Sequence, residues 1–199
     1  MTKINKKKIY LYGFNSEQVK IIKAKNKNAL FIDENIITKT INSCHAILAP
    51  NRKSIETALE KVEFKKNNNL KWIHLPGSGV EKYSKYFKYK KLTFTNGKGI
   101  QNHQISDHAI GLLLCLTRKI NFNIRYDQNV KFDKRPIELN QKKVVIVGFG
   151  GNGKMIAEKL LAFKMNVSAV NDTKKKTPRK IDFFLTKNIK KAVKNKDVI

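Results

Sequence analysis

Three glycines, Gly148, Gly150 and Gly153, have the spacing with the clearest chemical meaning in this sequence. A glycine turn of this spacing between a strand and a helix lets a pyrophosphate approach the backbone closely. The first glycine permits the tight turn, the second the approach, and the third the packing of helix on strand. The first helical amides, at Gly151 and Asn152, would point at the phosphates. The turn therefore predicts a dinucleotide site.

The elements around the turn decide how much weight this spacing carries, because G-x-G-x-x-G alone is a weak signal. An apolar strand is predicted at residues 144–147 before the turn, and an amphipathic helix follows it. A second apolar strand ends at Asn171 and Asp172. This strand, turn, helix and strand order favours a nucleotide fold over the alternative, a glycine-rich turn without a ligand.

The first half of the chain predicts alternating strands and helices, which is typical of βαβ units with a parallel sheet. The strands are expected at residues 9–14, 29–32, 46–48, 70–75 and 92–94. Helices are expected at 16–25 and 54–62, capped by Ser16 and Ser54. A long helix is expected from Asn102 to Tyr126, then a loop at 129–141. The end of the chain predicts a strand at 181–185, a helix at 189–194 and a last strand from Asp197.

The apolar side chains of the long helix are expected to form one broad face. They are Ile105, Ala109, Leu112, Leu113, Leu116 and Ile120.

The composition indicates a globular chain of 199 residues with an extreme net charge of +27. The lysines are spread over nearly every segment and do not form one stripe interleaved with aromatic residues. This predicts weak, salt-sensitive contact with nucleic acid but no specific nucleic-acid partner. Cys44 and Cys115 lack metal or redox spacing, and no metal site is predicted. The sequence has neither a signal-peptide core nor a run of about 20 apolar residues, which predicts a cytoplasmic protein without a membrane span.

Three stretches of the sequence resemble the D-isomer-specific 2-hydroxyacid dehydrogenase family. They are LKWIHLPGSGVEKY at 70–83, TFTNGKGIQNHQISDHAIGLLLCLTR at 93–118, and the nucleotide fold from Val144 to Asn171. The resemblance implies an α/β fold: a flavodoxin-like, parallel-sheet substrate domain at 1–100, then a linker helix and a partial Rossmann domain for NAD(P) at 101–199. It also implies an active site in the cleft between the domains, and a homodimer formed through the linker-helix region.

The implied activity is NAD(P)-dependent oxidation or reduction at the CH–OH group of a small D-2-hydroxy acid or its 2-oxo acid. Ser78 and Gly79 would offer backbone amides to the substrate carboxylate; a plain turn after the strand is the equal alternative. Asn96 is expected to be a turn residue rather than a ligand.

The resemblance also implies catalytic residues that this chain does not contain. The family's Arg and its paired His and Glu come from the later part of the Rossmann domain, beyond the position aligned with Ile199. None of the four histidines matches a catalytic position, so no catalytic residue is assigned. We expect a C-terminally truncated member whose 199 residues are inactive alone; the alternative is a non-catalytic protein that binds nucleotide or dimerises.

Cofactor choice is left open between NAD and NADP. By the family's pattern, NAD users have an acidic residue where this chain has Asn171, with Asp172 next. The absence of a charge at Asn171 removes the repulsion of a 2′-phosphate, and Lys174 and the basic residues up to Arg179 would pair with it. These contacts slightly favour NADP, unless Asp172 turns inward and restores the hydrogen bond to the ribose. A solvated basic loop is the alternative.

Overall fold

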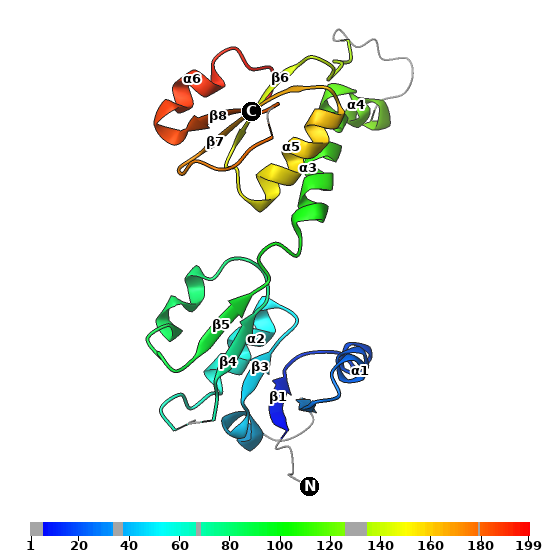
Figure 1. The fold of residues 1–199 in the computed structure, drawn as a ribbon. Helices are drawn as coiled ribbons and strands as arrows, with labels where there is room; N and C mark the ends of the chain where they lie inside the picture. The colour runs from blue at the N-terminus through cyan, green and yellow to red at the C-terminus, as the bar shows by residue number, and fades with distance from the viewer. Residues whose placement is uncertain (1–5, 34–37, 67–68, 126–134, 179) are drawn as a thin grey trace. The chain divides into compact units, whose positions relative to one another are not determined.

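The computed structural model describes residues 6–33, 38–66, 69–125, 135–178 and 180–199. The chain divides into two compact units, Met1–Lys98 and Gly99–Ile199, and each is considered by itself. Figure 1 shows the elements of both units. No described helix is both long and apolar enough to cross a membrane.

The first unit is a five-stranded parallel sheet whose strands lie in the order β2-β1-β3-β4-β5. The strands are β1 Lys7–Leu11, β2 Ala29–Asp33, β3 Ala46–Leu48, β4 Trp72–Leu75 and β5 Thr93–Asn96. The helices are α1 Ser16–Lys25, η1 Thr38–Ser43, α2 Arg52–Glu60 and η2 Glu81–Tyr86. The order 2-1-3-4-5 is the flavodoxin-like one, which confirms the predicted fold class of this half.

The core of the first unit lies between the sheet and α2. Ile55, Ala58 and Leu59 of α2 are buried against Ile47 of β3 and Ile73 of β4. The apolar residues of α2 recur at helical spacing, and burying this stripe fixes the helix on the sheet.

The second unit is a three-stranded parallel sheet in the order β6-β7-β8, with Val198 bridging Val144 on the other side of β6. The strands are β6 Lys143–Val147, β7 Asn166–Asn171 and β8 Asp182–Leu185. The helices are α3 Asn102–Thr117, α4 Ile120–Arg125, α5 Gly151–Ala162, η3 Thr186–Asn188 and α6 Ile189–Val193. The first strand of this unit, β6, thus lies at the centre, with β7 on one side and Val198 on the other. This is the Rossmann arrangement that the glycine turn predicted.

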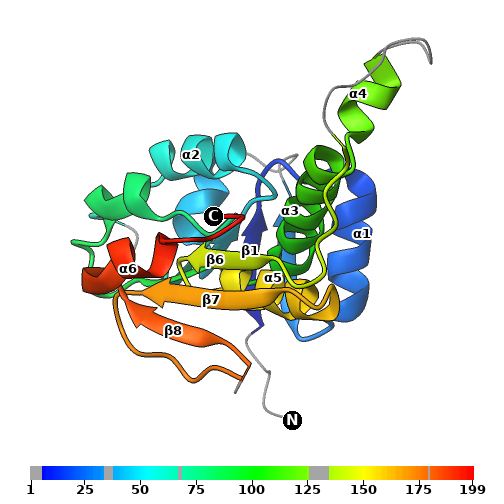
Figure 2. The same ribbon diagram turned by 90° about the horizontal axis from the view of Figure 1, so that it is seen from above.

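The sheet of the second unit is covered on both faces. Val144 and Val167 pack with α5 in one apolar cluster, and Val145 and Val170 pack with Ala192 of α6 in another. Neighbouring residues of a strand point to opposite faces, so both clusters draw on the same two strands. Figure 1 shows α5 and α6 on opposite sides of β7, and Figure 2 gives the view from above, with α6 at one end of β7.

The predicted long helix is wrong in one respect, because it breaks after α3. Lys119 has a φ of 59°, a left-handed conformation that an α-helix does not contain. The carbonyl of Thr117 accepts the amide of Ile137 at 2.8 Å instead of continuing the helical ladder. Tyr126 and residues 129–134 of the predicted loop lie outside the described residues.

Both predicted helix caps are also wrong, because asparagines take the place of the serines. Asn15 Oδ1 accepts the amide of Gln18 at 2.8 Å, and Gln18 Oε1 accepts the amide of Asn15 at 3.1 Å. Asn51 Oδ1 accepts the amide of Ser54 at 2.9 Å. These bonds satisfy amides that a helix start leaves free, so α2 begins two residues earlier than predicted.

Candidate functional site

The glycine turn lies between the end of β6 and the start of α5. Gly148 has a φ of +101°, a conformation that favours glycine, and it turns the chain away from the sheet. Gly150 is the N-cap of α5, and no side chain caps the helix there. Gly150, Gly151 and Asn152 are exposed. The first-turn amides and the positive end of the helix dipole are therefore open to an anion.

Gly153 holds α5 against β6. A Cβ built on Gly153 would overlap the carbonyl oxygen of Gly148 and lie 3.3 Å from Cγ2 of Ile146. The helix can approach the strand this closely only because residue 153 has no side chain. The turn thus has the geometry that a pyrophosphate requires, with a tight exit, an open N-terminus and a helix pressed onto the sheet.

Asn102 is a polar residue of this site that the sequence analysis did not identify. It begins α3, and its side-chain amide lies so near α5 that a Cβ on Gly151 would overlap Nδ2. Nδ2 is a hydrogen-bond donor beside an open helix N-terminus, where an anion would meet it. An ion pair between Asp107 of α3 and Lys159 of α5 fastens the two helices together. Asn102 is distant from the turn in the sequence, so no local pattern indicated this proximity.

Asn171, at the end of β7, closes the glycine turn from the neighbouring strand. Its Oδ1 accepts the amide of Phe149 at 3.2 Å, and its Nδ2 donates to the carbonyl of Thr173 at 3.0 Å. Phe149 is buried. The side chain that the sequence predicted to lie at the cofactor therefore fixes the backbone of the turn.

Asp172 and Lys174, the other two predicted residues, lie beyond β7. Asp172 Oδ1 accepts a hydrogen bond from the hydroxyl of Thr186 at 2.7 Å, which ties the carboxylate to the start of η3, directly after β8. Lys174 is exposed, as are Lys175 and Lys176. Arg179 lies outside the described residues.

The predicted substrate turn belongs to the first unit and follows β4. Gly77 has a φ of +83°, and Ser78 and Gly79 are exposed. Asn96 Nδ2 donates to the carbonyl of Ser78 at 2.9 Å. The amide of Gly97 donates to the carbonyl of Gly77 at 2.7 Å.

These two bonds fasten the turn after β4 to the end of β5, so the amides of Ser78 and Gly79 are held in one conformation. No hydrogen bond to either amide is found among the residues that the structure describes. A turn of this kind is able to hold a carboxylate.

Two of the four histidines bond to neighbouring strands of the first sheet. His45 Nδ1 accepts the amide of Lys8 at 3.1 Å, and His74 Nδ1 lies 2.9 Å from the hydroxyl of Thr95. Burial, with the charges of Lys7 and Lys8, lowers the pKa of His45 from its ordinary value of 6.5. His103 and His108 are exposed on α3.

Residues 110–199 match the family model of the D-isomer specific 2-hydroxyacid dehydrogenase NAD binding domain. The second unit is therefore similar to the NAD-binding domain of this dehydrogenase family. The match spans the glycine turn, Asn171 and the whole second sheet, so the cofactor of this unit is a nicotinamide dinucleotide.

Curated relatives agree with this family. A putative 2-hydroxyacid dehydrogenase of Staphylococcus epidermidis is 26% identical over 143 residues, which are 68% of this chain and 44% of the relative. A hydroxypyruvate reductase of Thermotoga maritima is 28% identical over 119 residues, which are 58% of this chain and 39% of the relative. This chain thus spans less than half the length of these relatives.

Solved structures share the fold of the whole chain. A D-isomer specific 2-hydroxyacid dehydrogenase family protein from Aeromonas salmonicida gives a TM-score of 0.80 at 19% identity, covering 98% of this chain and 63% of that one. A D-lactate dehydrogenase from Aquifex aeolicus, complexed with NAD and lactic acid, gives 0.66 at 19% identity, covering 96% and 59%.

Proposed function

We propose that the chain is part of an NAD(P)-dependent oxidoreductase that acts on the CH–OH group of small D-2-hydroxy acids. Its second unit would hold the dinucleotide, and its first unit would hold the substrate. The observation that carries this proposal is the α5 N-terminus, which has glycine at its cap and no capping side chain. When bound, the nicotinamide accepts or supplies the hydride.

The pyrophosphate would lie against the backbone of the glycine turn. We assign its contacts to the turn and to the first helical amides, with the Asn102 side chain donating from α3. The residues are Gly148, Gly150, Gly151, Asn152 and Gly153. A helix N-terminus favours negative charge, and the absence of side chains lets the phosphates come close.

The substrate carboxylate would bind the amides of Ser78 and Gly79. The bond from Asn96 to the Ser78 carbonyl supports this role, because it fixes the turn before any ligand arrives and reduces the cost of ordering it. The names of two relatives and neighbours, hydroxypyruvate reductase and D-lactate dehydrogenase, support small 2-oxo and 2-hydroxy acids as the substrate class.

The cofactor is proposed to be NADP in preference to NAD. Asn171 carries no charge, and the Asp172 carboxylate already accepts a hydrogen bond from Thr186. A 2′-phosphate would therefore meet little repulsion and would find Lys174 nearby in the chain. Charge-assisted hydrogen bonds contribute about 1.5–3 kcal/mol each, enough for a clear preference.

Residues 1–199 alone are proposed to bind cofactor without turning over substrate. This proposal is motivated by the family's Arg, Glu and His, for which the chain offers no matching residue. The test is an activity assay of purified residues 1–199 with NADPH or NADH and with glyoxylate, hydroxypyruvate or pyruvate. We expect no oxidation of the cofactor. Measurable turnover would refute this part of the proposal.

A homodimer through α3 is the proposed assembly. Leu112 and Leu116 are 53% and 61% exposed on this helix, and Ile105 is 42% exposed. Exposed apolar side chains on one helix mark an interaction surface. If residues 1–199 do not act as part of an oxidoreductase, the same surface and the glycine turn support a second function. The chain would then bind nucleotide and dimerise without catalysis.

Cofactor titration tests the central proposal. Purified 1–199 is titrated with NADPH and with NADH, and binding is followed by the fluorescence of the reduced nicotinamide. We expect saturable binding of both, with NADPH tighter. If neither binds, the dinucleotide site is refuted; if NADH binds as tightly as NADPH, only the cofactor preference is refuted.

A further inference from the structure

A lysine-rich and aromatic-rich segment of the first unit lies apart from the turns described above. Residues 82–91, KYSKYFKYKK, contain five lysines, four aromatic residues and no acidic residue. The lysines of the whole chain form no single stripe, but within this segment they alternate with aromatic residues. The segment covers most of η2 and the turn that leads into β5.

The fold brings a second segment against this one. Phe64, which follows α2, stacks on Tyr89 with ring centroids 4.7 Å apart and an angle of 13° between the rings. Tyr86 lies 5.2 Å from the same Phe64 ring. Phe64, Tyr86 and Tyr89 are only half-buried, so part of this aromatic surface faces solvent.

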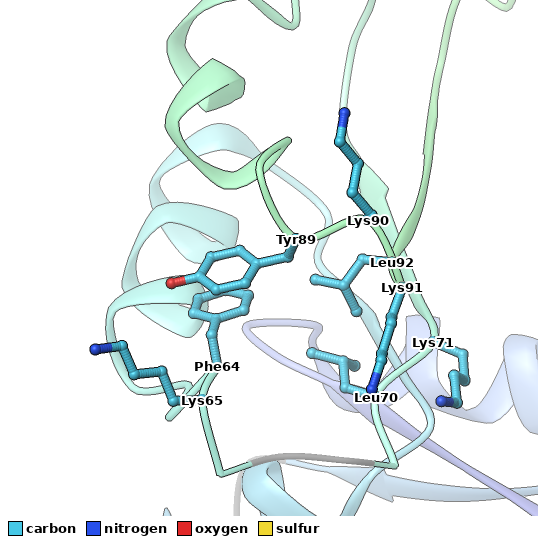
Figure 3. Close-up of a pocket in the computed structure, with 8 residues that line it drawn as sticks. All are labelled: Phe64, Lys65, Leu70, Lys71, Tyr89, Lys90, Lys91 and Leu92. Atoms are coloured by element: carbon cyan, nitrogen blue, oxygen red, sulfur yellow. The ribbon is translucent and has the colours of Figure 1, made fainter.

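A small pocket of about 170 Å³ opens beside the stacked rings. Leu70 and Leu92 form its apolar wall, and its rim carries Lys65, Lys71, Lys90 and Lys91. Figure 3 shows the Tyr89 ring over Phe64, and the four lysines extending to different sides of the pair. Pockets for whole drug-sized ligands begin at about 300 Å³. This pocket therefore suits a single ring of a larger molecule.

The charge around the pocket is almost entirely positive. Lys85 and Lys88 lie over the rings of Tyr86 and Tyr89, at 5.0 and 5.5 Å from their centroids. Glu63 is the acidic residue nearest in sequence to Phe64, and it pairs with Lys66 at 2.8 Å. The four lysines on the rim appear in no ion pair among the described residues, so their charges face solvent.

We propose that this surface binds single-stranded polynucleotide. One base would enter the pocket and pack on the Tyr89 and Phe64 pair, and the flanking phosphates would contact Lys71, Lys90 and Lys91. Aromatic platforms within a basic surface bind single strands in this way, because every base has a flat face and every nucleotide a charge. An acidic peptide would use the lysines but has no need for exposed stacked rings.

The position of the surface keeps it separate from the proposed substrate turn. Lys71 and Leu92 precede β4 and β5, whereas Ser78 and Asn96 lie at the other ends of these strands. A strand of four residues spans about 13 Å. The polynucleotide and a 2-oxo acid are therefore expected to bind without competing, and the inference stands independently of the proposed function.

The lysines are tested by fluorescence anisotropy with labelled oligo(U) and oligo(dT) of about 12 nucleotides. The variant Lys71→Gln/Lys90→Gln/Lys91→Gln is compared with a control of equal charge, Lys20→Gln/Lys25→Gln/Lys27→Gln on and after α1. Each lost phosphate contact lowers the slope of log K against log salt by about 0.7 for a single strand. We expect the magnitude of this slope to decrease by about 2 in the first variant, whereas the control should keep the wild-type slope.

The aromatic platform is tested with Tyr89→Leu and its conservative control Tyr89→Phe. Removal of one base–aromatic stack is expected to weaken binding roughly tenfold or more, while Tyr89→Phe keeps the affinity. Circular dichroism confirms that both variants are folded.

Three results would overturn the proposal. Equal weakening by the two lysine triples would show that binding is diffuse attraction to a basic chain. If duplex DNA binds as tightly as the single strand, stacking of a base on the aromatic rings does not contribute to binding. Poly-glutamate binding as tightly as oligo(U), with the same loss in Tyr89→Leu, would assign the surface to an acidic protein partner instead.

Discussion

The side-chain oxygen of Asn171 accepts a hydrogen bond from the backbone amide of Phe149 at 3.2 Å. One residue thus ends β7 and, at the same time, fixes the turn that follows β6. Its amide nitrogen donates to the carbonyl of Thr173 at 3.0 Å, so both ends of the side chain are in use. Under the proposed binding mode, cofactor preference and the shape of the phosphate turn would be linked through this single side chain.

Asn171→Asp is expected to shift cofactor preference from NADPH toward NADH. A carboxylate keeps the acceptor for Phe149 but repels a 2′-phosphate and accepts from a ribose hydroxyl. A repulsion as large as one charge-assisted contact, about 1.5–3 kcal/mol, corresponds to a decrease of roughly 10- to 100-fold in NADPH affinity. Titration with both cofactors measures the ratio. Asn140→Asp, the same change at an exposed turn before β6, should leave the ratio unchanged.

Gly150→Asp is expected to abolish dinucleotide binding while leaving the fold intact. A Cβ on Gly150 meets nothing within 4 Å, and aspartate is a favoured N-cap. The new carboxylate would occupy the α5 N-terminus and repel the pyrophosphate. Gly150→Asn caps the helix without charge, so it should weaken binding less. Cofactor titration and thermal unfolding measure the two effects, and full affinity in Gly150→Asp would exclude this turn as the phosphate site.

The parts of the site that are local in sequence could be predicted, and the parts made by distant residues could not. The turn from Gly148 to Gly153 sits within a strand–turn–helix pattern whose geometry follows from the glycines themselves. Asn102 comes near Gly151 only because α3 packs on α5. The contact of Asn171 with Phe149 likewise depends on strand pairing, which periodicity does not reveal.

The errors in the helices have a similar explanation. The sequence around Asn15 does contain a local signal for this cap, an asparagine followed three residues later by Gln18, which is a capping box. The break after Thr117 had no such signal, because it depends on a hydrogen bond from Ile137, in the segment before β6. Lysine at 119 is not a residue that favours a left-handed conformation.

His45 is expected to make the protein less stable as the pH falls below about 6.5. Its Nδ1 accepts the Lys8 amide, and burial and the nearby lysines lower its pKa in the folded state. The unfolded chain therefore takes up this proton first, which favours unfolding as the pH falls from 6.5 toward the folded pKa. Above 6.5 the imidazole is neutral in both states and has no effect.

An NMR titration of the imidazole checks the pKa of His45 directly, and urea unfolding at several pH values checks the stability. His45→Asn keeps a side-chain acceptor but does not titrate, so its stability should vary less with pH over this range. A pKa at or above 6.5 for His45 would contradict the prediction.

Cys44 is expected to resist thiol reagents in the folded protein, whereas Cys115 reacts. Burial raises the pKa of the Cys44 thiol to about 12, and its Sγ donates to the carbonyl of Ile41 at 3.0 Å. At pH 8 only about one thiol in ten thousand would be ionised, and the thiolate is the reactive form. Cys115 is half-buried on α3. Labelling followed by mass spectrometry should find Cys44 modified only in denaturant.

Gly153→Ala is expected to destabilise the second unit by about 1–3 kcal/mol, because the new methyl group would overlap the Gly148 carbonyl and force α5 away from β6. Gly111→Ala is the matched control. It lies within α3, a Cβ there meets nothing within 4 Å, and alanine is favoured in a helix by about 0.5–1 kcal/mol. The same substitution should therefore act in opposite directions at the two positions. Urea unfolding followed by circular dichroism measures both midpoints. An unchanged midpoint in Gly153→Ala would mean that contact with the strand does not require glycine at 153, and a lower midpoint in Gly111→Ala would contradict the expected gain from alanine in α3.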